Sequence, residues 1–548
     1  MIKARELSNE TNNAASKVVM AGKEALSAAI LDSLPSEYRK MHETRLIHIH
    51  DLEFYNTTYN CIGIDAASLA GTGNASFAQA VRRLGRGIVA LTNEQSGGIG
   101  IINADSDLAQ FVGDESDEAL DDALRGLFID LNCYTRKGCE KPYVTFNFGL
   151  GVSDKERRVA ESFLRVCREG DDDGCAFIFP NLVFKLKKGV NTAQGDPNYD
   201  LFETAVRTTA QRMLPTYLNC DSSANGTADI NPSRIGIMGC RSRVVKNLFG
   251  ESSSLNRGNV AAVSINLVQA ALRANGSLDR FYAELDGLTE TAAQMLLCRF
   301  HTLTDSVNLS RVFNAGYYMG SDSGSAFEML KNGTLAIGFI GLWDALGVIF
   351  GKDWTDADSM KPYLSHAYEV VRFMRGKTDA FIAREHLNFS LLASSAEGIS
   401  GAFARYDEAH DGKGCKVCEK GYYSNSFHVP VTVETDFFTK LEMEGPFHKL
   451  CNGGSISYVE LNEMPSGNPE AVAEIIESAC DADCNYIGIN FRLDQCRDCG
   501  YTGKLRDECP RCGSHNIRRL RRVSGYLAEV EDFSAGKKKE LADRRNHL

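Results

Sequence analysis

Long hydrophobic segments are missing from this chain of 548 residues. The longest apolar run covers residues 335–351 and is interrupted by Asp344, whereas a membrane-spanning helix needs about 20 apolar residues. The N-terminus is polar and has no apolar segment of the secretory type. We therefore expect no membrane partner and a cytoplasmic location, which would be the host cytoplasm if a phage encodes the chain.

An excess of positive charge is missing as well. The chain carries 72 acidic and 60 basic side chains, which gives a formal net charge of −12. Proteins that bind nucleic acids rely on a basic face, and here only the segment 518–522 is strongly basic. No nucleic-acid partner is therefore expected, although a zinc-ribbon nucleic-acid-binding or scaffold protein remains a minor alternative.

Familiar nucleotide-binding motifs, internal repeats and low-complexity linkers are also absent. The chain has no GxxxxGK[ST] loop, and its glycine clusters at 71–73 and 97–98 lack the context of a dinucleotide-binding fold. A nucleoside triphosphate would instead lie at helix N-termini and backbone amides, which need no motif.

Strand-like and helical patterns alternate through most of the chain. Strand-like apolar runs cover residues 143–150, 176–186, 235–238, 261–267, 335–340 and 456–461. Helical periodicity covers residues 14–34, 283–299 and 365–375, among others. This alternation predicts an α/β fold with largely parallel strands.

Cysteine, by contrast, is abundant, with 17 residues. Two CxxC pairs stand close together near the C-terminus: Cys496 with Cys499, and Cys509 with Cys512. This spacing predicts a tetrahedral four-thiolate zinc site, which is structural because no coordination position stays open. A further pair, Cys415 and Cys418, has no second pair at metal-site spacing, so it is read either as two loop thiols or as a redox pair.

A candidate radical site follows the zinc motif, at Gly525 in the segment 521–527 (RRVSGYL). A radical on a backbone Cα is stabilised when Cα flattens, and glycine has no Cβ to resist that geometry. The segment resembles the radical loop of glycyl radical enzymes, specifically of anaerobic (class III) ribonucleotide reductases. Many members have cysteine at the position of Ser524, which is not expected to block a radical on the backbone of Gly525.

The resemblance extends over almost the whole chain. Ordered matches occur at His50-Asp51-Leu52, Asn60-Cys61, 179–184, 195–201, 238–241, 258–267, 421–430 and 453–461. It implies a ten-stranded α/β barrel of two five-stranded parallel halves, with a central finger loop that carries Cys240 at its tip.

The resemblance also implies three segments and a dimer. Residues 1–491 would form the catalytic barrel without an N-terminal ATP-cone, residues 492–516 the zinc ribbon, and residues 517–548 the radical loop and tail. We expect a homodimer with ATP and deoxynucleoside triphosphates as effectors at a specificity site near the dimer interface.

The implied activity is the reduction of ribonucleoside triphosphates. An activating enzyme that uses S-adenosylmethionine and a 4Fe–4S cluster would place the radical on Gly525, which would pass it to Cys240 as a thiyl. The thiyl would remove the ribose 3′ hydrogen, and Cys61 would be the second active-site thiol. Ser426, His428 and Met238 are weaker candidates for binding the substrate.

Formate is the reductant that the resemblance favours. Asn266 fits an asparagine that positions formate or substrate, and Met238 two residues before Cys240 is typical of the formate-dependent branch. The alternative is a thioredoxin-type reductant, for which Cys415 and Cys418 would be the residues to test. A glycyl radical lyase is a further alternative, but such lyases lack the four-cysteine ribbon.

Overall fold

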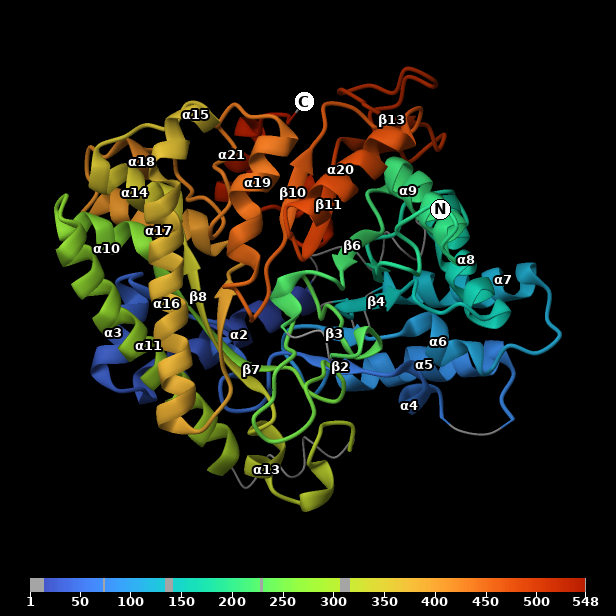
Figure 1. Ribbon diagram of the computed structural model, residues 1–548, viewed down its shortest axis with the longest axis horizontal. Coiled ribbons are helices and arrows are strands. Elements are labelled where there is room, and N and C mark those ends of the chain that lie inside the picture. Colours follow the sequence, from blue (N-terminus) through green and yellow to red (C-terminus); the bar gives the residue numbers. More distant parts are fainter. Residues whose placement is uncertain (1–13, 72–73, 134–140, 227–229, 306–315, 548) are drawn as a thin grey trace.

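The computed structural model describes residues 14–71, 74–133, 141–226, 230–305 and 316–547. Two sheets, of seven and four strands, form its centre, and helices flank them on both sides (Figure 1). A third sheet of four strands belongs to the C-terminal part of the chain. The predicted mixed α/β class is confirmed.

The first half of the fold is a set of five parallel strands. They are β2 (Ile62–Ile64), β3 (Ile99–Ile101), β4 (Val144–Phe148), β5 (Asn181–Leu186) and β6 (Thr216–Asn219). The helices α5 (Phe77–Leu91), α7 (Asp117–Leu131), α8 (Asp154–Glu169) and α9 (Tyr199–Arg212) run between successive strands. Parallel strands need such crossovers, because each strand must start from the same end of the sheet as the one before.

The second half repeats this pattern. Its strands are β7 (Asn259–Asn266), β8 (Thr334–Ile340), β9 (Phe389–Ala393), β10 (Ser457–Glu460) and β11 (Tyr486–Asn490). The connecting helices include α11 (Leu278–Asp305), α16 (Leu364–Glu385), α19 (Phe437–His448) and α20 (Pro469–Asp481). Strand β11 pairs antiparallel with β6 and so joins the two halves, and β1 (Ile47–Ile49) adds antiparallel to β7.

Isolated bridges link the remaining strand edges. Leu392 of β9 pairs in parallel with Gly454, just before β10, and Gly63 of β2 pairs with Arg257, just before β7. Strands β2 to β11 thus fall into two parallel sets of five, as the resemblance implies. Continuous pairing, however, is divided between the seven-stranded and the four-stranded sheet. A fully closed barrel wall therefore stays a prediction.

One face of the second set of strands is separate from the main hydrophobic core. Ala262, Ala336 and Leu392 form a cluster of their own, whereas Ile337 and Leu391 belong to the main core. Side chains alternate between the two faces of a strand, so these two groups lie on opposite faces. The two alanines of the separate cluster leave room for an inserted loop.

The segment 235–238 is the first part of that inserted loop, which covers residues 235–245, and its prediction as a strand is wrong. Its residues lie in a loop with a single isolated bridge, between Met238 and Ser242. Ile237 exchanges two hydrogen bonds with the side-chain amide of Asn147 on β4 (2.8 and 3.0 Å). An apolar run can be buried by insertion between strands as well as by pairing with them, and sequence pattern does not distinguish the two.

The third sheet contains the two C-terminal segments together. Its order is β13 (Thr502–Gly503), β12 (Leu493–Cys496), β14 (Ile517–Arg522) and β15 (Leu527–Glu529). Strand β12 follows β11 after only two residues and pairs with β14. The predicted ribbon and the predicted radical segment therefore share one sheet, which is attached directly to the central strands. Helix α21 (Ala535–Asp543) follows.

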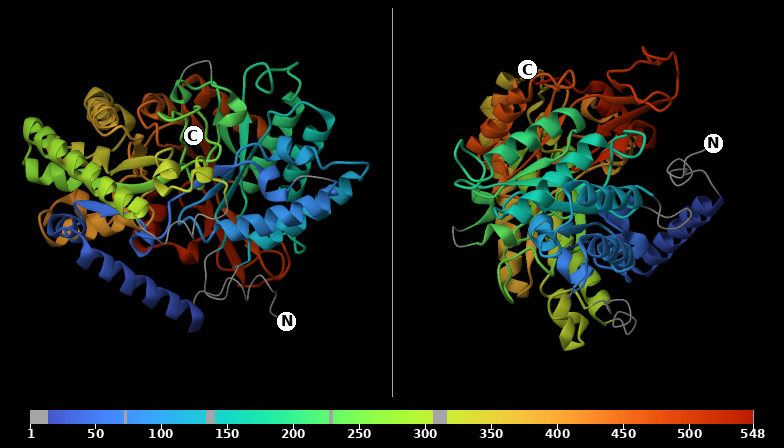
Figure 2. Two further views of the ribbon diagram at one scale, coloured as in Figure 1. Left: turned by 90° about the horizontal axis from the view of Figure 1, so that it is seen from below. Right: turned by 90° about the vertical axis from the view of Figure 1, so that its right-hand side faces the viewer.

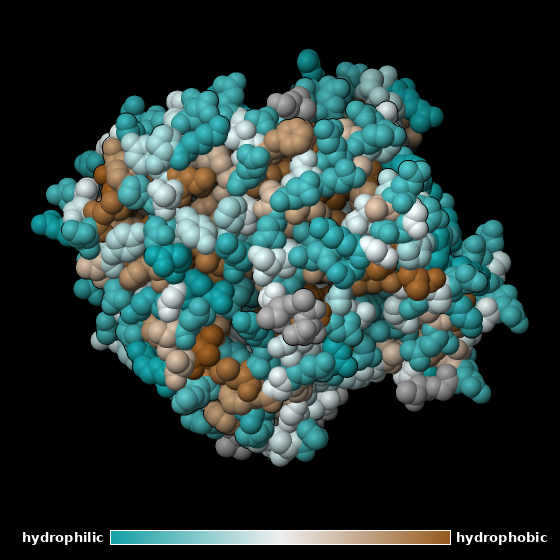
Figure 3. Space-filling model, in the orientation of Figure 1, coloured by the Kyte–Doolittle hydropathy of each residue, from teal (hydrophilic) through white to brown (hydrophobic). Residues whose placement is uncertain are grey.

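None of the described helices is long and apolar enough to cross a membrane. The face of the molecule in Figure 3 is largely hydrophilic, with scattered hydrophobic patches. Helix α2 (Ala14–Ser33) reaches away from the body (Figure 2) and exposes Val18, Met20 and Leu26.

Candidate active site

Four cysteines meet at one end of the C-terminal sheet. The sulfur atoms of Cys496, Cys499, Cys509 and Cys512 all lie within 4.8 Å of one another. Two of the separations are 3.6 Å, for the pairs Cys496–Cys512 and Cys499–Cys509. Tetrahedral zinc with Zn–S bonds of 2.3 Å requires sulfurs about 3.8 Å apart. The donor set and its spacing therefore fit a structural zinc ion.

Each CxxC pair forms the same tight turn. The amide of Gly500 donates to the carbonyl of Cys496, and the amide of Gly513 donates to the carbonyl of Cys509. Both glycines have positive φ, 72° and 73°, a conformation that glycine adopts at little cost. The two turns aim their thiols at a common centre, which explains how so short a segment builds four ligands.

The turn between β14 and β15, residues 523–526, carries the predicted radical position, and we refer to it as the radical loop. It brings Gly525 against Cys240. The amide of Val523 donates to the carbonyl of Tyr526 (3.0 Å), and Arg522 donates to the carbonyl of Gly525 (3.2 Å). A Cβ on Gly525 would lie 1.5 Å from the carbonyl oxygen of Cys240 and 2.7 Å from its Cα. The φ angle of Gly525 is not in the left-handed region, so the structure requires glycine here for space.

Cys240 lies at the tip of the inserted loop, residues 235–245. Thr145 of β4 donates to the carbonyl of Gly239 (2.9 Å), and Gly239 has a φ of +59°. On the β3 side, a Cβ on Gly98 would lie 2.5 Å from the Cα of Gly239, and one on Gly100 would lie 2.6 Å from the carbonyl oxygen of Ile237. Glycines on both sides of the contact therefore allow the loop to lie directly on the strands.

The environment of Cys240 keeps its thiol protonated. Burial raises the pKa of the thiol, and the carboxylate of Glu397 raises it further, while Arg241 and a hydrogen bond with Ser395 act in the opposite direction. The side chain is partly exposed although it lies deep in the fold. Transfer of a hydrogen atom to a carbon radical needs an intact S–H bond, which this environment maintains at neutral pH.

Cys61 lies beside the same loop. It clusters with Met238 and Val244. The backbone amide of Asn259 donates to the Cys61 sulfur (3.3 Å), and the backbone amide of Cys61 donates to the carbonyl of Asn259 (3.0 Å). Burial raises the pKa of the Cys61 thiol to about 12; the Asn259 and Ser242 hydrogen bonds offset part of this effect, and Cys240 adds to it. The structure thus brings together Gly525, Cys240, Cys61 and Met238 of the predicted residues.

Glu397 is the residue of this site that sequence reasoning missed. It lies in the loop after β9, and its two carboxylate oxygens accept hydrogen bonds from the hydroxyls of Ser524 (2.7 Å) and Tyr526 (2.9 Å). Its only sequence signal is its place after a parallel strand and before helix α17 (Ile399–Ala409), because ligand and catalytic groups gather at the carboxyl ends of such strands.

Asn266 is not brought to this cluster. It lies seven residues along β7 from Asn259, which corresponds to about 23 Å of strand. Its side chain caps helix α10 (Leu267–Ala274) by accepting from the amide of Gln269 (3.2 Å), and it donates to Asp407 (2.9 Å). The geometry assigns Asn266 a structural role, and Asn259 is the asparagine adjacent to Cys61.

The pair Cys415 and Cys418 lies near Asp407 as well. The Cys418 sulfur is 3.2 Å from the hydroxyl of Tyr423, which donates to Asp407 (2.8 Å). Asp407 also accepts from Asn266, so the pair is connected to the end of β7 that lies away from Cys61. Direct electron transfer from this pair to Cys61 is not favoured by that placement.

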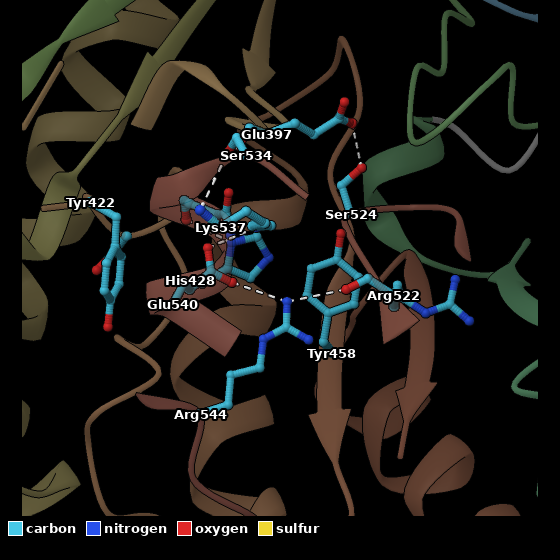
Figure 4. A network of polar contacts seen from close by, with 12 residues as sticks. Glu397, Tyr422, His428, Tyr458, Arg522, Ser524, Ser534, Lys537, Glu540 and Arg544 are labelled. Carbon is cyan, nitrogen blue, oxygen red and sulfur yellow. Dashed lines mark hydrogen bonds and ion pairs between the residues drawn. The ribbon is translucent and has the colours of Figure 1, made fainter. Parts of the chain in front are cut away.

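Ser426 and His428 lie in a packed region behind the radical loop. The ring of His428 stacks on Phe427 and on Tyr458, at centroid distances of 5.0 and 5.3 Å. Burial lowers the pKa of His428 to about 4, so the ring is neutral at pH 7 and adds no positive charge for a phosphate. Ser426 is fully buried. His428 and Tyr458 line a cavity that also reaches Arg522, Ser524 and Arg544 (Figure 4).

Comparison with known proteins gives one consistent result. The family model for anaerobic ribonucleoside-triphosphate reductase matches residues 6–547. The anaerobic ribonucleoside-triphosphate reductase of Escherichia coli (strain K12) is 30% identical over 606 residues, which cover 99% of this chain and 83% of that protein. The enzyme of the same name from enterobacteria phage T4 is 26% identical over 607 residues, with 99% and 97% covered.

A solved structure has the same fold. The anaerobic ribonucleotide reductase from Thermotoga maritima in complex with dATP and CTP superposes with a TM-score of 0.75 at 15% sequence identity. The match covers 98% of this chain and 92% of that one.

Zinc should be bound by the four clustered cysteines at one ion per chain. Replacing Cys509 with alanine should remove the ion, because three thiolates and no fourth ligand leave the site open. Metal analysis after dialysis measures this, with Cys480→Ala as the control that keeps its zinc. Full zinc content in Cys509→Ala would contradict the assignment of the ligands.

Cys61 should react slowly with iodoacetamide in the folded protein. Its pKa of about 12 leaves almost no thiolate at pH 8, and its alkylation rate should rise about tenfold per pH unit without a plateau up to pH 10. Peptide mass spectrometry measures the rate, with the protein in guanidinium chloride as reference, where the plateau should appear near the ordinary thiol pKa of about 8.5. A plateau below pH 9 in the folded state would refute the buried, protonated thiol.

Proposed function

This chain belongs to the family of anaerobic ribonucleoside-triphosphate reductases, and we propose that it reduces ribonucleoside triphosphates to 2′-deoxyribonucleoside triphosphates by glycyl and thiyl radical chemistry. The observation that carries the proposal is the near-contact between Gly525 and Cys240. A hydrogen atom moves between two heavy atoms only when they approach closely, and the fold brings these two residues together from distant parts of the chain.

In the proposed reaction, Gly525 holds the stored radical and Cys240 gives it a hydrogen atom. The Cys240 thiyl then removes the 3′ hydrogen of the ribose, and the 2′ hydroxyl leaves as water after taking up a proton. Cys61, the second protonated thiol beside the loop, supplies hydrogen on the other side of the sugar. The hydrogen held by Cys240 finally returns to C3′, and the thiyl left on Cys240 takes a hydrogen back from Gly525, which restores the stored radical. Formate replaces the hydrogen that Cys61 has given up.

Formate is the reductant that we propose. The overall step then balances as substrate C2′–OH plus formate and one proton, giving C2′–H, carbon dioxide and water. Met238 in contact with Cys61 supports this choice, as does the placement of Cys415 and Cys418 away from Cys61. We propose that Asn259, which adjoins Cys61, positions formate or substrate in place of Asn266. A thioredoxin-type reductant is the alternative, and no contact of the described residues favours a glycyl radical lyase.

Zinc, when bound, would hold the two cysteine turns together and leave no open position for substrate. The ribbon would then act only by supporting β12 and β14, from which the radical loop extends. We further propose a homodimer, an activating partner that uses S-adenosylmethionine and a 4Fe–4S cluster, and a cytoplasmic location. Effector control by ATP and deoxynucleoside triphosphates is proposed because a relative has been solved with dATP in its specificity site.

The radical should be observable on Gly525. After anaerobic activation by such a partner, the protein should show a doublet in its EPR spectrum, and exposure to air should cleave the chain at Gly525 and release a short C-terminal peptide. Gly525→Ala should give neither signal, because alanine has a Cβ and does not fit against Cys240. A doublet of normal intensity in Gly525→Ala would disprove the location of the radical.

Activity assays should distinguish the roles of Cys240, Cys61 and the reductant. Cys240→Ser should keep the Gly525 doublet and lose turnover, because an O–H bond is too strong for the glycyl radical to break. Cys61→Ser should exchange the 3′ hydrogen or release base without forming deoxynucleotide. Labelled formate should yield one labelled carbon dioxide per deoxynucleotide. Full turnover with a thioredoxin system and none with formate would remove the formate proposal and leave the reductase proposal standing.

A further inference from the structure

Glu397 contacts the radical loop on both sides of Gly525. One carboxylate oxygen accepts from the hydroxyl of Ser524 (2.7 Å) and the other from the hydroxyl of Tyr526 (2.9 Å). The backbone carbonyl of the same glutamate accepts from Ser534 (3.2 Å), which starts α21. Figure 4 shows the carboxylate of Glu397 pointing toward the hydroxyl of Ser524.

The glutamate is itself held close to the reacting thiol. Glu397 lies in the loop that follows β9. In this loop Ala396 has a φ of +54°, and Ser395 forms a hydrogen bond with the Cys240 thiol. Arg241, next to Cys240, donates to the carbonyls of Ala393 and Ser394 at the start of this loop (3.2 and 3.3 Å). One short segment therefore touches both partners of the hydrogen transfer, which makes it suited to set their separation.

We propose that Glu397 is a positioning residue that latches the radical loop onto Cys240 through Ser524 and Tyr526. The two hydroxyl bonds must break before Gly525 can leave its place against Cys240 and reach an activating partner. The latch is strong because hydroxyl bonds to a carboxylate are charge-assisted. Serine at position 524 contributes to the latch, since a hydroxyl is a better donor than a thiol would be.

Local hydrogen exchange tests the latch in the protein without a radical, and so independently of the proposed function. Ser524→Ala, Tyr526→Phe and Glu397→Gln should each raise the exchange rate of amides 523–527 by about tenfold or more, the effect of losing one charge-assisted bond. Adding Tyr526→Phe to Glu397→Gln should accelerate exchange less than Tyr526→Phe does in the wild type, because the uncharged side chain at position 397 has already lost the charge that strengthens the tyrosine bond. Retained zinc and unchanged exchange of β14 would show that each variant is folded.

Tyr422→Phe is the matched control. It also removes a tyrosine hydroxyl that donates to a carboxylate, that of Asp543 at the end of α21 (2.8 Å), but this bond does not involve Glu397. Exchange of amides 523–527 should match wild type in this variant. Equal acceleration in Tyr422→Phe, or exchange within twofold of wild type in Glu397→Gln, would overturn the latch.

A second measurement rests on the proposed function. With the activating partner present, Tyr526→Phe should gain the EPR doublet faster than wild type, because its loop opens more often, and its turnover should fall because Gly525 spends less time at Cys240. General destabilisation would lower both quantities, so opposite directions distinguish a positioning role. Parallel loss of both would overturn the latch; absence of a doublet in wild type would instead refute the proposed function and leave the exchange result valid.

Discussion

The close approach of Gly525 to the backbone of Cys240 is the constraint on which the rest of the structure depends. The space between them does not admit a single added methyl group. A loop from the middle of the chain and a loop near its C-terminus must therefore be positioned closely against each other. Gly98, just before β3, and Gly100 within it support the Cys240 loop from one side, and the C-terminal sheet holds the radical loop from the other.

Buried arginines provide much of that positioning. Arg522 ends β14 and donates to the side chain of Asn490 and to the carbonyls of Met213 and Gly525. It therefore ties the radical loop to strand β11 and to the C-terminal end of helix α9. Burial lowers the pKa of Arg522, which is the electrostatic cost of placing a charge among neutral acceptors. Arg544 of the C-terminal tail donates to the carbonyl of Arg522 and pairs with Glu540 (Figure 4).

The sequence predicts a site best when the site depends on residue type and on short spacings along the chain. The four zinc cysteines and the glycine after them are of this kind, and the structure gathers the four thiols as their spacing indicates. The sequence does not show which residue of a strand lies next to the site. Asn259 and Asn266 belong to the same strand, and only the fold shows that one meets Cys61 while the other caps a helix. Glu397 meets Ser524 across 127 positions of sequence, and no local pattern predicts such a contact.

The pairing of β12 with β14 has a consequence for how the C-terminal region tolerates changes in length. Leu493 is paired with Leu520 and Cys496 with Ile517. Strand β14, which precedes the radical loop, is therefore held in a fixed register against β12, which follows β11. A deletion or insertion of one residue between Ile517 and Gly525 would shift Gly525 by about 3.3 Å and turn the following side chains to the other face. Length changes between Thr502 and Cys509 would leave that register intact. Homologous chains should therefore vary in length inside the ribbon and keep a fixed count of residues from β14 to the glycine.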